Sequence, residues 1–138
     1  MALNKLKTII LRFRDLSVPN TIEQHKEICN SDGYVWWGWW SKPQETVPLE
    51  AFCKLLEECQ KPDGLEILLF DSGNKLLYKA VCEDIKFDPG KKKVESPEKS
   101  KTPAYYVETQ FLAWFKFRSI GDPMPNRDAL YLLRGYSY

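Results

Sequence analysis

Histidine is almost missing from this chain of 138 residues, which has only His25. One histidine and four cysteines without a CxxC pair are too few and too scattered for a usual zinc site, so we expect buried free thiols, no metal and no cofactor. The sequence also lacks a Ser-His-Asp set, a Cys-His pair and a glycine-rich phosphate loop. We therefore expect no enzyme, and we expect His25 on the surface of a short helix.

Long hydrophobic runs and an excess of one charge are lacking too. No stretch approaches the roughly 18 apolar residues of a membrane-spanning helix, and the start is too charged for a signal peptide. We expect a cytoplasmic protein without a membrane partner. The net charge is +1, so any affinity for nucleic acid must come from a local patch. The length suits one domain over residues 1–138, which leaves open whether it is the amino-terminal module of a longer protein.

Hydrophobic periodicity and turn residues divide the chain into alternating elements. The patterns predict strands near residues 5–17, 34–40, 65–71, 75–87 and 104–122, helices over 18–33 and 49–59, and a short helix and a strand over 123–138. The lysine-rich residues 89–103 are expected to form a mobile loop. Strands outnumber helices, which predicts an α+β fold, a small curled mixed β-barrel with two or three flanking helices.

Aromatic residues gather in "YVWWGWW", residues 34–40. Side chains alternate between the two faces of a strand. This places Val35, Trp37 and Trp39 on one face, predicted to be core. The other face carries the candidate ligand-binding residues, which are Tyr34, Trp36, Gly38 and Trp40. Gly38 leaves bare backbone that a flat group can approach.

Spacing limits what these indoles can do alone. Trp36 and Trp40 are roughly 13 Å apart along a regular strand, too far to clamp one base between them. A second wall must come from elsewhere, and Tyr105, Tyr106 and Trp114 are the candidates. The competing interpretation is that all these rings belong to the hydrophobic core.

Two further segments resemble a known superfamily. "ILLFDSGNKLLYKAVCEDIKFD" has a strand that ends in the short polar turn Phe70–Gly73 and a second strand that leads to Asp88, and "AWFKFRSI" is a later strand of apolar and basic residues. With the aromatic strand before them, they resemble the PUA-like superfamily, which includes EVE, ASCH and YTH domains.

The resemblance implies a small barrel that binds RNA or modified bases in DNA, with a flipped base in an aromatic pocket. Such domains often recognise nucleic acid for restriction and antiphage proteins that carry an effector domain. On this reading Trp36 and Trp40 stack on the base, and Asp71 and Ser72 supply an acceptor and a donor. The candidate phosphate contacts are Lys42, Lys91, Lys92 and Lys93.

Two alternatives remain open. The domain is a sensor or protein-interaction module of a larger defence or regulatory protein, with the tryptophans as interface anchors. Or it is a small hydrolase like some ASCH proteins, acting on RNA or modified nucleosides. Lys79 and Glu83 share one face of a predicted strand beside Tyr78 and suit acid–base chemistry, although an ion pair is the simpler interpretation.

Overall fold

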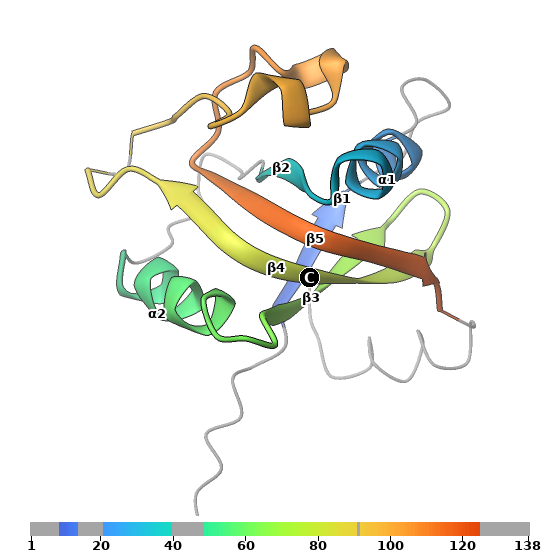
Figure 1. The fold of residues 1–138 in the computed structure, drawn as a ribbon, viewed down its shortest axis with the longest axis horizontal. Coiled ribbons are helices and arrows are strands. Elements are labelled where there is room, and N and C mark those ends of the chain that lie inside the picture. The colour runs from blue at the N-terminus through green and yellow to red at the C-terminus, as the bar shows by residue number, and fades with distance from the viewer. Residues whose placement is uncertain (1–8, 14–20, 40–48, 91, 125–138) are drawn as a thin grey trace, which may run out of the picture.

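In a computed structural model the chain folds around one curled sheet (Figure 1). The structure describes residues 9–13, 21–39, 49–90 and 92–124. The strands are β1 (Ile9–Phe13), β2 (Val35–Trp39), β3 (Leu65–Asp71), β4 (Leu76–Phe87) and β5 (Ala113–Pro123). The helices are α1 (Thr21–Asp32) and α2 (Leu49–Cys59), with two 3₁₀ turns, η1 (Lys99–Lys101) and η2 (Ala104–Tyr106). The helix and strand predicted over 123–138 fall mostly outside the described residues.

The sheet is mixed and has the strand order β1-β3-β4-β5-β2. β1 runs parallel to β3, and the other pairs are antiparallel. Register shifts interrupt the long β4–β5 pair, and such irregularities bend strands. β1 and β2 are the two outer strands, yet the ring centroids of Phe13 and Trp37 lie 5.2 Å apart. The sheet therefore curls until its edges come close, which confirms the predicted small α+β barrel.

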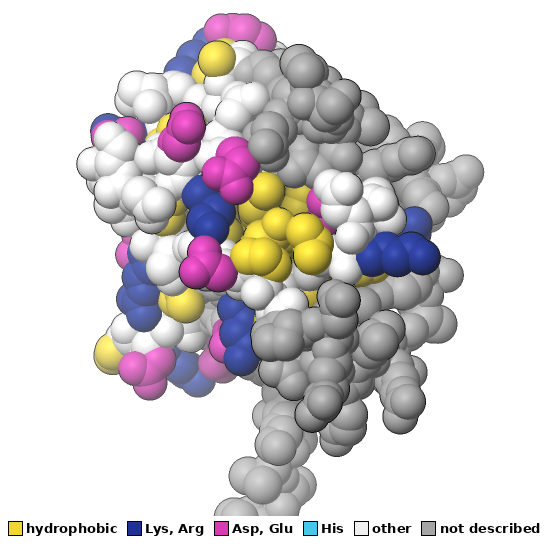
Figure 2. All heavy atoms as spheres, turned by 90° about the vertical axis from the view of Figure 1, so that its right-hand side faces the viewer, with side chains coloured by type: hydrophobic (Ala, Val, Ile, Leu, Met, Phe, Trp, Pro, Cys, Tyr) yellow, Lys and Arg dark blue, Asp and Glu magenta, His cyan; other side chains and the backbone are white. Residues whose placement is uncertain are grey.

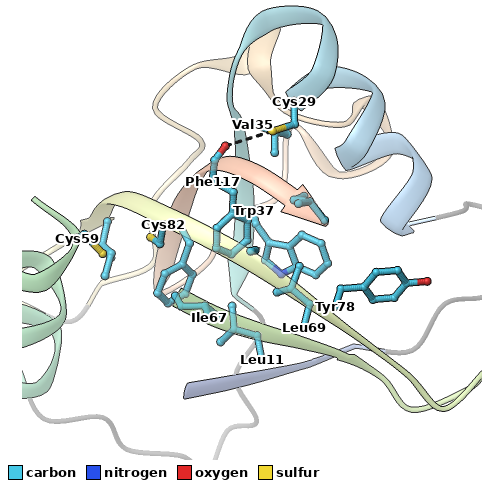
Figure 3. Close-up of a cluster of buried hydrophobic side chains, with 14 of the residues drawn as sticks. Leu11, Cys29, Val35, Trp37, Cys59, Ile67, Leu69, Tyr78, Cys82 and Phe117 are labelled. Atoms are coloured by element: carbon cyan, nitrogen blue, oxygen red, sulfur yellow. Dashed lines mark hydrogen bonds between the residues drawn. The ribbon is translucent and has the colours of Figure 1, made fainter. Parts of the chain in front are cut away.

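The inner face of the curled sheet holds the main core (Figure 3). Its buried residues alternate along each strand, as Ile67 and Leu69 do on β3. α1 packs beside β2 and β5, and α2 packs beside β3 and β4 (Figure 1). Cys29, Cys59 and Cys82 are buried free thiols as predicted, whereas the prediction is wrong for Cys53, which is exposed on α2.

Each helix has a local reason to stop. α1 ends before Gly33, whose φ of 88° lies in the left-handed region, and the Gly33 amide donates to the Cys29 carbonyl at 2.9 Å. α2 has a strongly apolar face that buries Phe52 and Cys59, and Pro62 follows its end. No helix in the described ranges is both long and apolar enough to cross a membrane.

Residues 92–111 form what we call the cover segment, which lies over the outer face of β2 and β5 (orange in Figure 1). The composition predicts a mobile loop over 89–103; the described residues 92–103 of this stretch make specific contacts in the structure. Val94 forms a β-bridge with Phe111, and the hydroxyls of Ser96 and Thr102 are buried and bonded to each other. The contacts of Val94, Ser96 and Thr102 depend on how the segment folds, and the composition of the segment alone does not predict them.

Candidate nucleic-acid site

The alternation predicted for the tryptophan strand is present. Val35 and Trp37 belong to the main core, and Trp39 packs against it. Trp36 points to the outer face, where it forms a second aromatic cluster under the cover segment. The members of this outer cluster are Tyr34, Trp36, Val94, Tyr106, Phe111 and Trp114.

Trp36 does not line an open cavity as predicted, because only 4% of its surface is exposed. The cover segment lies on it and shields its indole from water. Trp40 lies outside the described residues. Trp114, predicted as a second wall, is fully buried, and its Nε1 donates to the Val94 carbonyl at 2.8 Å. The side chain of Tyr105 also lies outside the described part of the chain.

The backbone at Gly38 is not accessible to a ligand as predicted, because two aromatic side chains cover it. A Cβ built on it would lie 2.4 Å from Phe111 Cδ2 and 3.1 Å from Trp114 Cζ3. The Phe111 ring therefore occupies the position next to Gly38 at which the sequence pattern predicts a flat ligand. This contact joins residues that are far apart in the sequence, so spacing along β2 could not reveal it.

Tyr106 fixes the cover segment to the edge of β2 and to α1. Its hydroxyl accepts a hydrogen bond from the Gly38 amide at 3.0 Å and is bonded to His25 Nε2. His25 Nδ1 must donate to the Thr21 carbonyl, 2.8 Å away, because a carbonyl only accepts. In a neutral ring this leaves Nε2 as the acceptor, so the Tyr106 hydroxyl donates to it.

His25 was predicted on the surface, and this prediction is wrong. It is fully buried, and its ring lies 4.1 Å from that of Trp37, between centroids. Burial lowers its pKa from 6.5 to about 3, although the bond to Thr21 opposes the shift. His25 is therefore neutral at physiological pH and holds the fold together through its two ring nitrogens.

Glu98, which the sequence did not single out, is the polar group of the outer cluster. Its Oε2 accepts from the Tyr34 hydroxyl at 2.6 Å and its Oε1 from Trp36 Nε1 at 3.1 Å. These bonds, and then the nearby lysines, lower the pKa of Glu98 below its usual value, while partial burial opposes them. An ionised, half-exposed carboxylate thus stands at the margin of the aromatic cluster.

Two lysines lie next to the same tyrosine. The Lys116 Nζ is 4.2 Å from the centroid of the Tyr34 ring, and the Lys101 Nζ is 6.0 Å from it. About a quarter of each side chain is exposed, 25% for Lys116 and 28% for Lys101. We call Tyr34, Glu98, Lys101 and Lys116 the Glu98 rim. Tyr34 is half-buried and is the only member proposed from the sequence.

The charge of the Glu98 rim is not strongly positive. Lys116 pairs with Glu83 at 3.6 Å and Lys101 with Asp32 at 3.3 Å, and Glu98 adds a third acid. Such a surface does not attract a polyanion over long range. What it offers a ligand is an aromatic ring, a carboxylate and two locally placed ammonium groups.

Asp71 and Ser72 shape the β3–β4 turn. Asp71 is 1% exposed, and its Oδ1 accepts from the amides of Gly73 at 2.9 Å and Asn74 at 3.2 Å. The Ser72 amide donates to the Phe13 carbonyl of β1 at 2.8 Å. These bonds account for both residues as turn formers.

The face turned to the right in Figure 1 shows hydrophobic side chains gathered at its centre, beside charges of both signs (Figure 2).

The other predicted residues do not gather at the outer cluster in the described part of the chain. Lys42 and Lys91 lie outside the described residues, and Lys92 and Lys93 are exposed next to the Asp88 turn. Lys79 is exposed, Tyr78 is buried in the main core, and Glu83 pairs with Lys116. In the described ranges no three His, Cys, Asp or Glu side chains are grouped to hold a metal ion.

One signal for the missed residues was present in the sequence. Lys116 lies two residues after Trp114, so both point to the same face of β5, and the register pairs Lys116 with Trp36 and Trp114 with Gly38. No such signal marks Glu98, which is one acid within a lysine-rich stretch. Its position depends on how the cover segment folds back over the sheet.

Comparison with known protein families decides the family. The Pua-like model matches residues 9–138, nearly the whole chain. The chain belongs to the Pua-like family. Domains of this family generally bind nucleic acid, RNA in particular. No curated protein and no solved structure matches this Pua-like chain.

Proposed function

We propose that this Pua-like domain is a nucleic-acid-binding module that takes a single unpaired base at the Glu98 rim. The observation that supports the proposal most is the pair of hydrogen bonds that Tyr34 and Trp36 donate to Glu98. These bonds hold the Glu98 carboxylate, which can accept hydrogen bonds from the edge of a base, next to the partly exposed ring of Tyr34. A flipped or single-stranded base needs these two features, a stacking surface and a polar group at its edge.

Each member of the rim has a role in this proposal. Tyr34 stacks on the base, which displaces the Lys116 ammonium from the ring. Lys116 and Lys101 then contact phosphates on either side of the base. Trp36 does not stack, because it is buried; it holds Glu98 in place through its indole N–H.

We propose that modified bases in DNA or RNA are accepted, since a methyl group adds apolar surface that packs against Tyr34. In the proposed biological setting the domain recognises nucleic acid for a restriction or antiphage protein, and a fused or associated effector acts on it. Binding without catalysis is proposed, because the Glu83 carboxylate is paired with Lys116 rather than with Lys79.

Fluorescence anisotropy with labelled single-stranded RNA and DNA oligonucleotides, unmodified and carrying modified bases, tests the proposal. Tyr34→Leu removes the stacking ring and is expected to weaken binding about tenfold or more, since base–aromatic stacking is worth about 1–3 kcal/mol. Phe70→Leu is the matched control, because Phe70 is a half-buried aromatic residue of a different cluster on β3. It is expected to bind as the wild type does.

Salt adds a second readout. Two lysines allow about one or two phosphate contacts, so the logarithm of affinity should fall with the logarithm of salt concentration with a slope of only about −1. Equal binding by wild type and Tyr34→Leu would contradict the proposed site. A stable protein complex through this surface, with no oligonucleotide bound, would favour the interaction-module alternative instead.

A further inference from the structure

We infer that the Glu98 rim selects guanine, the base whose edge offers two adjacent N–H donors. The inference rests on the proposed function and specifies its ligand.

The Glu98 carboxylate is held by one hydrogen bond on each oxygen. Oε2 accepts from Tyr34 at 2.6 Å and Oε1 from Trp36 at 3.1 Å. An ionised carboxylate has about four acceptor positions, so these two bonds occupy one position per oxygen. Both donors belong to β2 or the residue before it, which fixes the plane of the group. One further acceptor position on each oxygen is then left for a ligand with two donors.

The backbone of Glu98 is held as firmly as its side chain. Its carbonyl accepts from Thr102 Oγ1 at 2.7 Å and its amide donates to Ser96 Oγ at 3.2 Å, while the single hydroxyl proton of Ser96 goes to Thr102 Oγ1. Ser96 and Thr102 are themselves buried. A group fixed in this way recognises a ligand without first losing conformational freedom.

The four bases differ in what they present to such a carboxylate. Guanine carries the N1–H and an N2 amino hydrogen side by side, a parallel pair that suits the two oxygens of a carboxylate. Adenine and cytosine present an amino group beside a ring nitrogen that accepts, and uracil presents one N–H between two carbonyl oxygens. In each of these a lone pair would face the negative carboxylate. Guanine alone avoids this repulsion.

An arginine side chain of a protein partner also carries paired N–H donors. The lysines beside Tyr34 favour the base, because a nucleotide gives the displaced Lys116 a phosphate to pair with and an arginine side chain does not. The Lys116 Nζ lies 4.2 Å and the Lys101 Nζ 6.0 Å from the ring centroid. The phosphates of a nucleotide can pair with both ammonium groups, whereas a guanidinium offers them no acceptor.

The test uses single-stranded RNA octamers of uridine with one central nucleotide varied among guanosine, inosine, N1-methylguanosine and adenosine. Inosine lacks the N2 amino group, and N1-methylguanosine lacks the N1–H. Guanosine is expected to bind about tenfold more tightly than adenosine, and each single deletion to lose several-fold, because hydrogen bonds to charged groups are strong. This series needs no change in the protein.

A substitution then assigns the selectivity to Glu98. Glu98→Gln presents one acceptor and one donor, the combination that suits adenine, so the preference is expected to move from guanosine toward adenosine. A purely structural role would weaken all octamers equally. Glu95→Gln is the matched control, since Glu95 is an exposed acid of the same segment that pairs with Lys99 at 3.9 Å. It should keep the preference for guanosine.

The outcomes separate the two claims. Equal affinity for the four octamers, weakened by Tyr34→Leu, would overturn guanine selection and leave the proposed function standing. Absence of binding to every octamer would overturn both. Binding of an arginine-rich peptide that depends on Glu98, without a preference for guanosine, would also overturn the inference.

Discussion

At the scale of single residues, Gly38 shows how tightly the outer cluster is packed. It has no side chain, and the Phe111 ring fills the space in which one would lie. The absent Cβ lets the cover segment approach β2, and the Tyr106 hydroxyl reaches the Gly38 amide at the same place. Gly38 therefore serves contacts within the protein rather than contacts with a ligand.

Gly38→Ala is expected to destabilise the protein by about 1–3 kcal/mol, because overpacking forces neighbours to shift. The new Cβ would lie 2.4 Å from the Phe111 ring. Gly121→Ala is the control, since a Cβ there would meet only the Lys79 carbonyl at an ordinary 3.4 Å. Urea unfolding of both variants measures the difference. Equal stability of Gly38→Ala and wild type would show that Phe111 does not pack on Gly38.

At the scale of elements, α1, β2 and η2 are joined through one buried histidine. The chain of hydrogen bonds runs from the Gly38 amide through the Tyr106 hydroxyl to His25 and ends at the Thr21 carbonyl. Breaking it leaves buried polar groups unpaired, which costs about 1–3 kcal/mol each. These bonds set the position of the segment that carries Glu98.

The buried state of His25 predicts a loss of stability in mild acid. Its pKa is about 3 in the folded protein and 6.5 when the side chain is solvated. As the pH falls below 6.5 the unfolded chain takes up a proton that the folded protein does not, so the free energy of unfolding decreases. Between pH 7 and pH 5.5 the expected decrease is about 1 kcal/mol.

Urea unfolding at a series of pH values measures this effect. His25 is the only histidine of the chain, so a His25→Gln variant should lose the slope in this range, whatever its overall stability. A wild-type stability that stays flat from pH 7 to 5.5 would mean that His25 is not buried as a neutral ring.

The elements themselves were largely predictable, because their signals are local. The apolar face of α2, the polar turn at Asp71–Asn74 and the alternation along β2 each follow from neighbouring residues. The predicted core role of Trp37 follows from the same alternation. What could not be predicted depends on contacts between distant segments, as when Phe111 covers Gly38 and Tyr106 buries His25. For this reason the sequence predicts a site at the indoles of β2, whereas the structure points to Tyr34 and Glu98.

At the scale of the whole molecule, the curled sheet presents two different surfaces. Its inner face is filled by the main core, and on its outer face at β2 and β5 the cover segment packs on the outer cluster, with the partly exposed groups of the Glu98 rim beside it. The net charge of +1 provides no general attraction for a polyanion. In the proposed function, binding therefore depends on local contacts with a base, which makes the Glu98 rim the central claim.

The most direct measurement is a ¹⁵N–¹H spectrum of the tryptophan indole groups during titration with a guanosine-containing RNA octamer. The Trp36 Nε1–H donates to Glu98, whereas the Trp114 Nε1–H donates to the buried Val94 carbonyl. With signals assigned by Trp→Phe substitution, we expect the Trp36 indole signal to shift as RNA binds and the Trp114 signal to stay nearly in place. RNA that saturates the protein while the Trp36 signal does not move would contradict the account.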